Sequence, residues 1–323
     1  MAKRTTDAWN RKHLLGLEDL TAAEILAVLD TADECFPFST GRRPAPRVLE
    51  GRTILNLFCE DSTRTRTSFT FAAERLGARV FQFHAQTSSL NKKESLADTV
   101  RNIDMMGLDA IVIRHRQRGA PDRVAESVTC SVLNAGDDAH EHPTQALLDM
   151  LAVRRRLGKI EGLTLALVGD VRHSRVARSN LFGWSKFGNR VIFVGPRVFT
   201  ENLDVDVETT TDFDAVLPEC DAVMMLRVQF ERHESIHFDF DAYARDYQLT
   251  PERLAAAKPG TLVLHPGPIN RGVELANEVA DGPQSLILYQ ARCGVAVRMA
   301  ALRLCIAALD RQREADADED ESP

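Results

Sequence analysis

No apolar stretch in this 323-residue chain approaches the roughly 18 residues that a membrane-spanning helix needs. The segment Met1–Leu20 lacks the hydrophobic core of a secretory signal peptide. The six cysteines include no C-x-x-C pair, and most lie in apolar or strand-like segments, as buried reduced thiols do. We therefore expect a cytoplasmic protein with no membrane partner.

Strong basic charge is also missing. The net charge is −7, but the segment 310–323 holds seven acids and two arginines, so the rest of the chain carries only −2. A nearly neutral body gives no support for a nucleic-acid partner. The acidic tail 310–323 is too polar to pack, and we expect it to be disordered.

The usual metal and nucleotide motifs are absent as well. His140, His142 and His233 have no accompanying ligand spacing, so no metal site is expected. There is no G-x-x-x-x-G-K-[ST] motif, and the turn 168–170 has one glycine where a dinucleotide fold would show G-x-G-x-x-G. We expect no cofactor.

Strand-like and helical segments alternate along the whole chain, which predicts parallel sheets covered on both faces. The predicted strands are 53–58, 80–83, 110–113, 132–134, 164–168, 191–194, 222–226 and 261–264. The length suits two domains, so the predicted fold is α/β, with two doubly wound parallel-sheet domains. The first covers 1–150, with a last helix, 285–309, returning to pack on it, and the second covers 151–284.

Polar clusters follow six of these strands. They are 62–66, 114–115, 141–145, 172–175, 227–229 and 265–268. Ligands of open α/β sheets bind outside the carboxyl ends of the strands, so the pattern predicts an active site in a cleft between the two domains. The clusters are rich in arginine and contain only Glu60 and Glu141 as carboxylates, which indicates anionic ligands and argues against hydrolysis by paired acids.

The densest cluster, D-S-T-R-T-R-T-S-F at 61–69, falls where a strand ends and a helix begins. Free amide groups at a helix start, the helix dipole and flanking arginines form a site for a phosphate-like anion. Ordinary helix capping by Ser and Thr is the alternative interpretation.

Five motifs together resemble the aspartate/ornithine carbamoyltransferases, and among them the aspartate-specific catalytic chains. They are S-T-R-T-R at 62–66, R-H at 114–115, H-P-T-Q at 142–145, R-V-Q at 227–229 and H-P-G-P at 265–268. The resemblance implies that carbamoyl phosphate and L-aspartate give N-carbamoyl-L-aspartate and phosphate, the committed step of pyrimidine synthesis. The amine would attack the carbamoyl carbon directly, and the departing phosphate would take the proton.

The resemblance also implies roles for particular residues. Carbamoyl phosphate would be bound by Ser62, Thr63, Arg64, Thr65, Ser88, Lys92, Arg114, His142, Gln145, Gly267 and Pro268. Aspartate would be bound by Lys92, Arg175, Arg227 and Gln229. The catalytic residues would be Arg64, Thr65, Arg114 and His142. The alternative interpretation of Arg114 is a solvated charge at a strand end, and the alternative for His142 is a helix N-cap.

Three further expectations come from the family. Lys92 would enter a neighbouring subunit's site in a trimer; many members read Lys-Gly-Glu here, and counting from the following L-A-D-T favours Lys92 over Lys93. Glu60 would pair with Arg175 and Arg232. The stretches H-P-G-P-I-N-R-G-V-E-L and A-D-G-P-Q-S resemble members that assemble with a dihydroorotase or dihydroorotase-like chain.

Two rival interpretations remain. One is an ornithine or other carbamoyltransferase, although ornithine enzymes typically show H-C-L-P where this chain has H-P-G-P, and an S-M-G loop that is not found. A basic substrate would also require an acidic side chain at the positions of Arg227 and Gln229. The other rival is a non-catalytic anion-binding protein of similar fold. The family often has Leu at the place of Gly267, so only backbone contacts are expected from that position.

Overall fold

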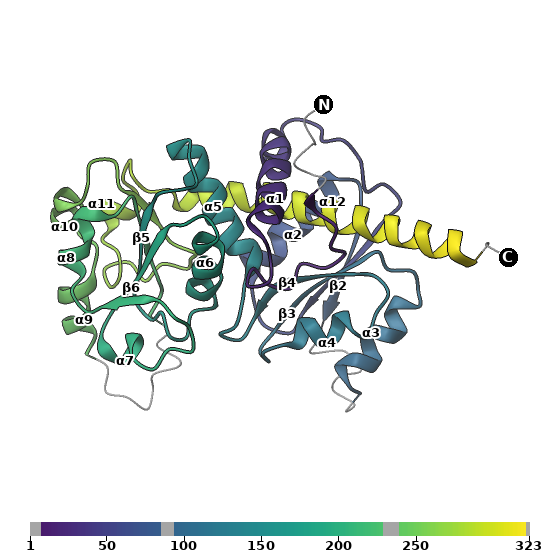
Figure 1. Cartoon of the computed structure of the whole chain (residues 1–323), viewed down its shortest axis with the longest axis horizontal. Helices are drawn as coiled ribbons and strands as arrows, with labels where there is room; N and C mark the ends of the chain where they lie inside the picture. The colour runs from purple at the N-terminus through teal and green to yellow at the C-terminus, as the bar shows by residue number, and fades with distance from the viewer. Residues whose placement is uncertain (1–7, 85–93, 229–238, 321–323) are drawn as a thin grey trace. The chain divides into compact units, whose positions relative to one another are not determined.

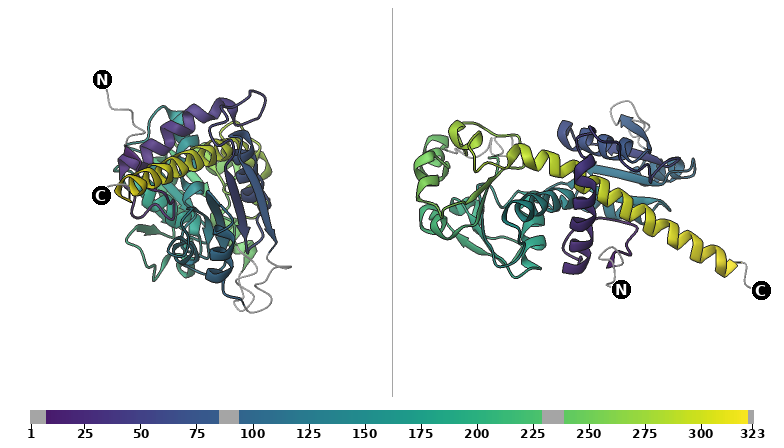
Figure 2. Two further views of the ribbon diagram at one scale, coloured as in Figure 1. Left: turned by 90° about the vertical axis from the view of Figure 1, so that its right-hand side faces the viewer. Right: turned by 90° about the horizontal axis from the view of Figure 1, so that it is seen from above.

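The computed structural model describes residues 8–84, 94–228 and 239–320 (Figures 1 and 2). The chain divides into two compact units, the first made of Met1–Leu151 with Arg292–Pro323 and the second of Ala152–Ala291. Two helices, α5 (Pro143–Leu157) and α12 (Ile287–Asp320), contribute residues to both units. The expected division into a domain at 1–150 and a domain at 151–284 remains a proposal.

The first unit is a four-stranded parallel sheet with strand order β2-β1-β3-β4. Its strands are β1 (Thr53–Phe58), β2 (Arg79–His84), β3 (Ala110–His115) and β4 (Ser131–Asp137). Its helices are α1 (Ala22–Cys35), η2 (Phe36–Phe38), α2 (Thr63–Arg75), α3 (Leu96–Asp104) and α4 (Ala120–Ala125), with the first part of α5 and most of α12.

Helix α1 begins with a capping box formed by Thr21 and Glu24. Thr21 Oγ1 accepts from the Glu24 amide at 3.2 Å, and Glu24 Oε2 accepts from the Thr21 amide at 2.8 Å. The two side chains thus satisfy amides that the helix itself leaves without acceptors.

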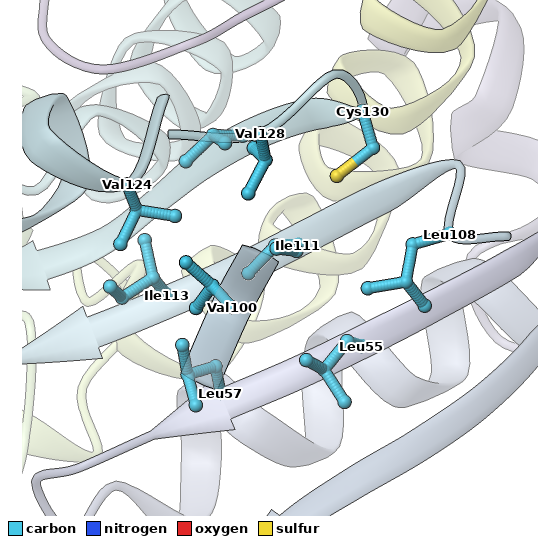
Figure 3. Close-up of a cluster of buried hydrophobic side chains, with 10 residues drawn as sticks. Leu55, Leu57, Val100, Leu108, Ile111, Ile113, Val124, Val128 and Cys130 are labelled. Carbon is cyan, nitrogen blue, oxygen red and sulfur yellow. The ribbon is translucent and has the colours of Figure 1, made fainter. Parts of the chain in front are cut away.

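The core of this unit follows from alternation along the strands. Leu55 and Leu57 of β1 point to the same face as Ile111 and Ile113 of β3, where Val100 of α3 packs with them (Figure 3). The opposite face carries helices α2 and α12. Asn56 Nδ2 donates to Thr70 Oγ1 of α2 at 3.0 Å, and Ser131 Oγ donates to the Cys305 carbonyl of α12 at 3.2 Å. Both faces are therefore covered, as a parallel sheet requires.

The second unit is a five-stranded parallel sheet with strand order β7-β6-β5-β8-β9. Its strands are β5 (Thr164–Val168), β6 (Arg190–Val194), β7 (Glu208–Thr210), β8 (Ala222–Met225) and β9 (Leu262–Leu264). Its helices are α6 (Arg175–Ser185), α7 (Arg197–Thr200), α8 (Phe213–Val216), η5 (Leu217–Glu219), α9 (Phe240–Tyr247), α10 (Pro251–Ala256) and α11 (Asn277–Ala280).

The predicted fold class, two parallel-sheet α/β domains, is confirmed. The edge strand β7 was not among the predicted strands, because its three residues are polar and mostly exposed and so lack any apolar alternation. Among the described residues, no helix is both long enough and apolar enough to cross a membrane.

The expectation that the acidic tail 310–323 is disordered is wrong for its described part, which is helical and continues α12. Specific contacts hold the start of this segment. Asp310 Oδ2 pairs with Arg52 Nη2 at 2.8 Å, and Arg311 Nη2 donates to the Trp9 carbonyl at 3.0 Å. The segment also consists largely of good helix formers, so an existing helix propagates into it at little cost. The composition of the tail shows that it is polar, but it cannot show these contacts with distant residues.

Candidate active site

The first group of candidate residues lies at the point where the strand order of the first sheet reverses. The chain goes from β1 outward to β2 on one side and then returns to add β3 on the other, so β1 and β3 are neighbours whose following segments diverge. Such a switch point leaves a crevice at the carboxyl ends of the strands. The predicted clusters at 62–66 and 114–115 follow these two strands, and 141–145 follows the adjacent β4.

Helix α2 starts within the first of these clusters. Ser62 is the N-cap, but its side chain accepts no capping hydrogen bond, so ordinary side-chain capping does not account for this serine. Thr65 is buried, while Thr63 and Arg64 are exposed. The amides of the first turn have no acceptor within the helix by its geometry, and together with the helix dipole they suit an anion.

Arg114, near the end of β3, links the segment that follows β1 to strand β4. Its Nη2 pairs with Glu60 Oε1 at 2.7 Å, and its Nη1 donates to the Ala135 carbonyl at 3.3 Å. The side chain is only 10% exposed, so the interpretation as a solvated charge is wrong. The expected pairing of Glu60 with Arg175 and Arg232 stays a prediction, and Arg232 lies outside the described residues.

The segment that carries His142 is held by a buried aspartate, Asp137. Its Oδ1 accepts from Asn134 Nδ2 at 2.9 Å and from the Glu141 amide at 3.1 Å, while its Oδ2 accepts from the Gly119 amide at 2.9 Å. Burial alone would raise the pKa of Asp137, but hydrogen bonds from His140, Asn134 and the Gly119 amide hold it below its usual range. The loop therefore presents His142, which is itself buried at the start of α5, in one fixed position.

Glu141 acts as an anchor for the start of the chain. Its two carboxylate oxygens accept from the Leu17 amide at 3.0 and 2.9 Å, and Oε1 also accepts from the Glu18 amide at 3.2 Å. A Cβ at Gly16 would collide with the same oxygen, which explains the glycine. Since the carboxylate is buried and engaged by backbone amides, it is a structural group and not an acid or base.

Gln145, in the first turn of α5, contacts a buried aspartate that no sequence motif predicts. Its Nε2 donates to Asp149 Oδ1 at 2.9 Å. Arg298 of α12 is attracted electrostatically to Asp149, and its Nη1 donates to Ser68 Oγ of α2 at 2.7 Å. Burial lowers the pKa of Arg298 to about 9, while the attraction to Asp149 opposes that shift.

The second group lies at the switch point of the other sheet, between β5 and β8. The two strand ends approach closely there: Gly169 has φ +129°, and a Cβ on it would lie 2.9 Å from the Leu226 carbonyl oxygen. Arg175 is the first residue of α6, whose N-cap Ser174 accepts from the Ala177 amide at 3.1 Å. Arg175 and Arg227 are both partly exposed and lie at this edge of the sheet.

The predicted wall segment 265–268 follows β9, next to β8. His265 Nδ1 accepts from the Gly267 amide at 2.8 Å, so a neutral ring carries its proton on Nε2, which lies 3.1 Å from Glu274 Oε1. Gly267 has φ +67°, a left-handed conformation that glycine adopts without strain and Leu does not. Pro268 follows it. Asn270 Nδ2 donates to the Val228 carbonyl at 3.2 Å and thereby ties this segment to the one carrying Arg227.

Two buried aspartates were missed in the sequence, although a signal for them exists. Asp137 precedes His140 by three residues, and Asp170 precedes His173 by three; both form a D-x-x-H pattern at or just past the end of a strand. The His140 Nδ1 to Asp137 Oδ2 distance is 3.1 Å, and the His173 Nδ1 to Asp170 Oδ1 distance is 2.9 Å. Each pair fixes the loop at its strand end. Ser88, Lys92 and Gln229 lie outside the described residues.

The two groups define a class of protein: an α/β protein whose two parallel sheets each present arginines and helix starts at a switch point. In the first unit, the start of α2, Arg114, His142 and Gln145 all lie at the carboxyl ends of neighbouring strands. The second brings together Arg175, Arg227 and the segment 265–268. Such groups bind anions and stabilise negative charge that develops during a reaction.

Comparison with known proteins identifies the family. Residues 12–155 match the aspartate/ornithine carbamoyltransferase carbamoyl-P binding domain, and residues 161–305 match the Asp/Orn binding domain of the same family. The chain belongs to the aspartate/ornithine carbamoyltransferase family.

Its relatives include the aspartate carbamoyltransferase catalytic subunit of Geobacter sulfurreducens, which is 50% identical over 91% of this chain and 96% of that protein. A structure of aspartate transcarbamoylase from Trypanosoma cruzi in complex with carbamoyl phosphate and aspartate has a TM-score of 0.83 at 32% identity, covering 92% of this chain and 96% of that one. Ornithine carbamoyltransferase from Pyrococcus furiosus also has a TM-score of 0.83, at 29% identity over 92% and 97% of the two chains.

The stability of the folded chain should depend on pH through His140. Its hydrogen bond to Asp137 raises the pKa of His140, so folding favours the protonated ring. That stabilisation is complete below the ordinary pKa of about 6.5 and is lost as the pH rises through the raised pKa of the folded state. We expect His140→Gln to reduce the loss of stability between about pH 6.5 and 8.5, measured as the urea midpoint at each pH.

His13 provides the control, because burial lowers its pKa to about 4 and its Nδ1 accepts from the Val132 amide at 3.0 Å. It is neutral in the folded state throughout that window, and its effect on stability falls on the acid side of about pH 6.5. His13→Gln should therefore lower the urea midpoint by a similar amount at every pH above about 6.5. The change of the midpoint with pH should stay as in the wild type. If the urea midpoint of His140→Gln changed with pH as much as that of the wild type, His140 would not be the source of the pH dependence.

Proposed function

We propose that the chain is an aspartate carbamoyltransferase, which transfers the carbamoyl group of carbamoyl phosphate to the amine of L-aspartate. The fold does not choose the amine, because the aspartate and ornithine enzymes superimpose on it equally well. The observation that carries the choice is the pair of arginines at the second switch point, Arg175 and Arg227, which suit the two carboxylates of aspartate. The nearby Asp170 is fully buried and engaged by His173, so it offers no site for a second amine.

In this proposal the start of α2 holds the phosphate of carbamoyl phosphate. The amides of Thr63, Arg64 and Thr65, the hydroxyl of Ser62 and the guanidinium of Arg64 supply donors and charge. Arg114 bridges the phosphate and the carbamoyl oxygen. Support comes from the way Arg114 is held, since contacts on both sides fix its guanidinium before any ligand binds.

The amine of aspartate attacks the carbamoyl carbon and forms a tetrahedral oxyanion. Thr65, Arg114 and His142 donate to that oxygen as its charge grows, and the departing phosphate accepts the proton from the amine. Gln145 contacts the carbamoyl amino group, and Gly267 and Pro268 border it through their backbone. Fixing both substrates contributes on the order of 7–11 kcal/mol, and one well-placed donor about 2.7–4 kcal/mol.

Several finer points belong to the same proposal. The product would enter pyrimidine synthesis, and Gln229 would join the two arginines on aspartate. A cytoplasmic location fits the six cysteines, which are all free thiols. A dihydroorotase or dihydroorotase-like partner chain remains a prediction from the sequence.

The first test supplies carbamoyl phosphate with either L-aspartate or L-ornithine and follows phosphate release and the carbamoylated product. We expect carbamoyl aspartate, with ornithine at background, because Arg175 and Arg227 repel a second ammonium group. Arg227→Ala should raise KM for aspartate at least about tenfold, as the loss of a charge-assisted carboxylate contact does. Carbamoyl ornithine as the main product would show that the chain is an ornithine carbamoyltransferase. If neither amine gave a product, a non-catalytic anion-binding protein would be the remaining interpretation.

His142→Ala should lower kcat about a hundredfold to a thousandfold, with a smaller change in KM for carbamoyl phosphate, because the oxyanion exists only during attack. His142→Asn keeps an N–H donor and should recover part of the loss. Steady-state kinetics at saturating aspartate measure both. If His142→Ala weakened carbamoyl phosphate binding and kept its turnover at saturation, the oxyanion role would be wrong.

We also propose a trimer in which Lys92 and Ser88 enter the site of a neighbouring subunit. Mixing inactive Lys92→Ala and Arg64→Ala chains should then restore part of the activity, since some hybrid interfaces carry two native contributions. For random assembly of equal amounts, the expected recovery is about a quarter of the sites. Refolded mixtures compared with each variant alone measure it. Activity that stays at the level of the parents would place each site within one chain.

A further inference from the structure

The amide of Gln145 has two chemically different ends, and its position in the first turn of α5 makes the choice between them important. One end is a donor and the other an acceptor, and the two have nearly the same shape. The structure directs Nε2 to Asp149 Oδ1 at 2.9 Å, one helical turn further along α5. Asp149 therefore determines which end of Gln145 remains for a ligand.

Asp149 can make this choice only as a carboxylate, which accepts hydrogen bonds and donates none. It is completely buried, where an isolated carboxylate would be neutral. The fully buried guanidinium of Arg298 attracts it and supplies the opposite charge. A protonated Asp149 would have a hydroxyl donor beside its acceptor oxygen and could therefore bind either end of the amide.

Arg298 is itself held from several directions. Its Nη1 donates to Ser68 Oγ of α2 at 2.7 Å, and its guanidinium carbon lies 5.1 Å from the ring centre of Phe69. A Cβ at Gly294, one turn earlier in α12, would lie 2.8 Å from the same Nη1, so the helix backbone approaches the charge closely. The guanidinium has little freedom to move away from Asp149.

We infer that Arg298 and Asp149 are positioning residues that orient Gln145 so that its carbonyl oxygen, and not its NH₂ group, faces the carbamoyl amino group. The inference rests on the proposed function, which brings that amino group to Gln145. The carbonyl accepts from an NH₂ group and gains nothing from a methyl group in the same place. The pair thereby selects carbamoyl phosphate over an acyl phosphate of the same size, such as acetyl phosphate.

The competing view is that the pair only clamps α2, α5 and α12 together. A clamp affects every ligand of the first unit alike, whereas orientation of Gln145 affects only the ligand with an amino group. The experiment therefore compares three probes on the full-length enzyme: KM for carbamoyl phosphate, and the competitive inhibition constants of acetyl phosphate and inorganic phosphate.

Asp149→Asn should raise KM for carbamoyl phosphate about tenfold, while both inhibition constants stay within about twofold, because an amide in place of the carboxylate no longer fixes Gln145. Arg298→Lys keeps the positive charge and should keep most of the discrimination. A parallel change for all three probes, or an unchanged ratio in a folded variant, would overturn the inference.

Removing one partner of a buried pair can prevent folding, so the double variant Asp149→Asn/Arg298→Met removes both charges at once. It should show the same tenfold loss of discrimination even if its stability returns to that of the wild type. A discrimination that returned together with stability would establish the clamp.

Asp104→Asn is the matched control, since Asp104 is also buried and accepts from the Thr129 amide at 2.7 Å and from Thr129 Oγ1 at 3.0 Å. It should leave the ratio of the three constants unchanged. A wild-type enzyme that makes no carbamoyl aspartate defeats the proposed function. An active wild type whose Asp149→Asn variant keeps its discrimination defeats this inference alone.

Discussion

The carboxyl edge of a parallel sheet is the constraint on which both groups of candidate residues depend. At the switch points between β1 and β3, and between β5 and β8, adjacent strands send their chains in opposite directions. Neither chain covers the ends of the two strands, so the first turns of the following helices stay open with their amide groups. An anion is the natural ligand of such an edge, and Arg114, Arg175 and Arg227 lie there.

Precision at that edge comes from buried charges and not from the loops themselves. Asp137 collects amides from three segments, and Glu141 fastens the start of the chain to the loop before His142. A buried carboxylate is tolerated because several N–H groups replace its water, and removal of those donors would leave a costly unpaired charge. The same requirement that stabilises each charge therefore fixes the loop that carries it.

Much of the scaffold was predictable because strands buried on both faces are continuous apolar runs. The bounds of β1 and β5 coincide with the predicted segments, and the other predicted strands overlap observed ones. The exposed strand β7 carries no such run. The helical continuation of α12 depends on contacts with Arg52 and Trp9, which lie far away in sequence.

The candidate site shows the same division. The polar clusters were visible because each follows a strand, but the geometry behind them was not. Nothing in the local sequence connects Asp149 to Arg298, because 149 residues separate them and only the packing of α12 on α5 brings them together. The buried aspartates Asp137 and Asp170 were detectable in principle from their spacing to a histidine three residues later.

The discontinuity of the first unit has a consequence for synthesis. The ribosome makes Met1–Leu151 first, then the whole of Ala152–Ala291, and only then the helix that covers one face of the first sheet. Until α12 emerges, Asp149 lacks the guanidinium of Arg298, and the side chains of Ala296, Ala300 and Cys305, which are buried in the finished unit, are not yet in place. The nascent chain thus carries an unfinished sheet throughout the translation of the second unit, a long interval in which chaperones have a surface to bind.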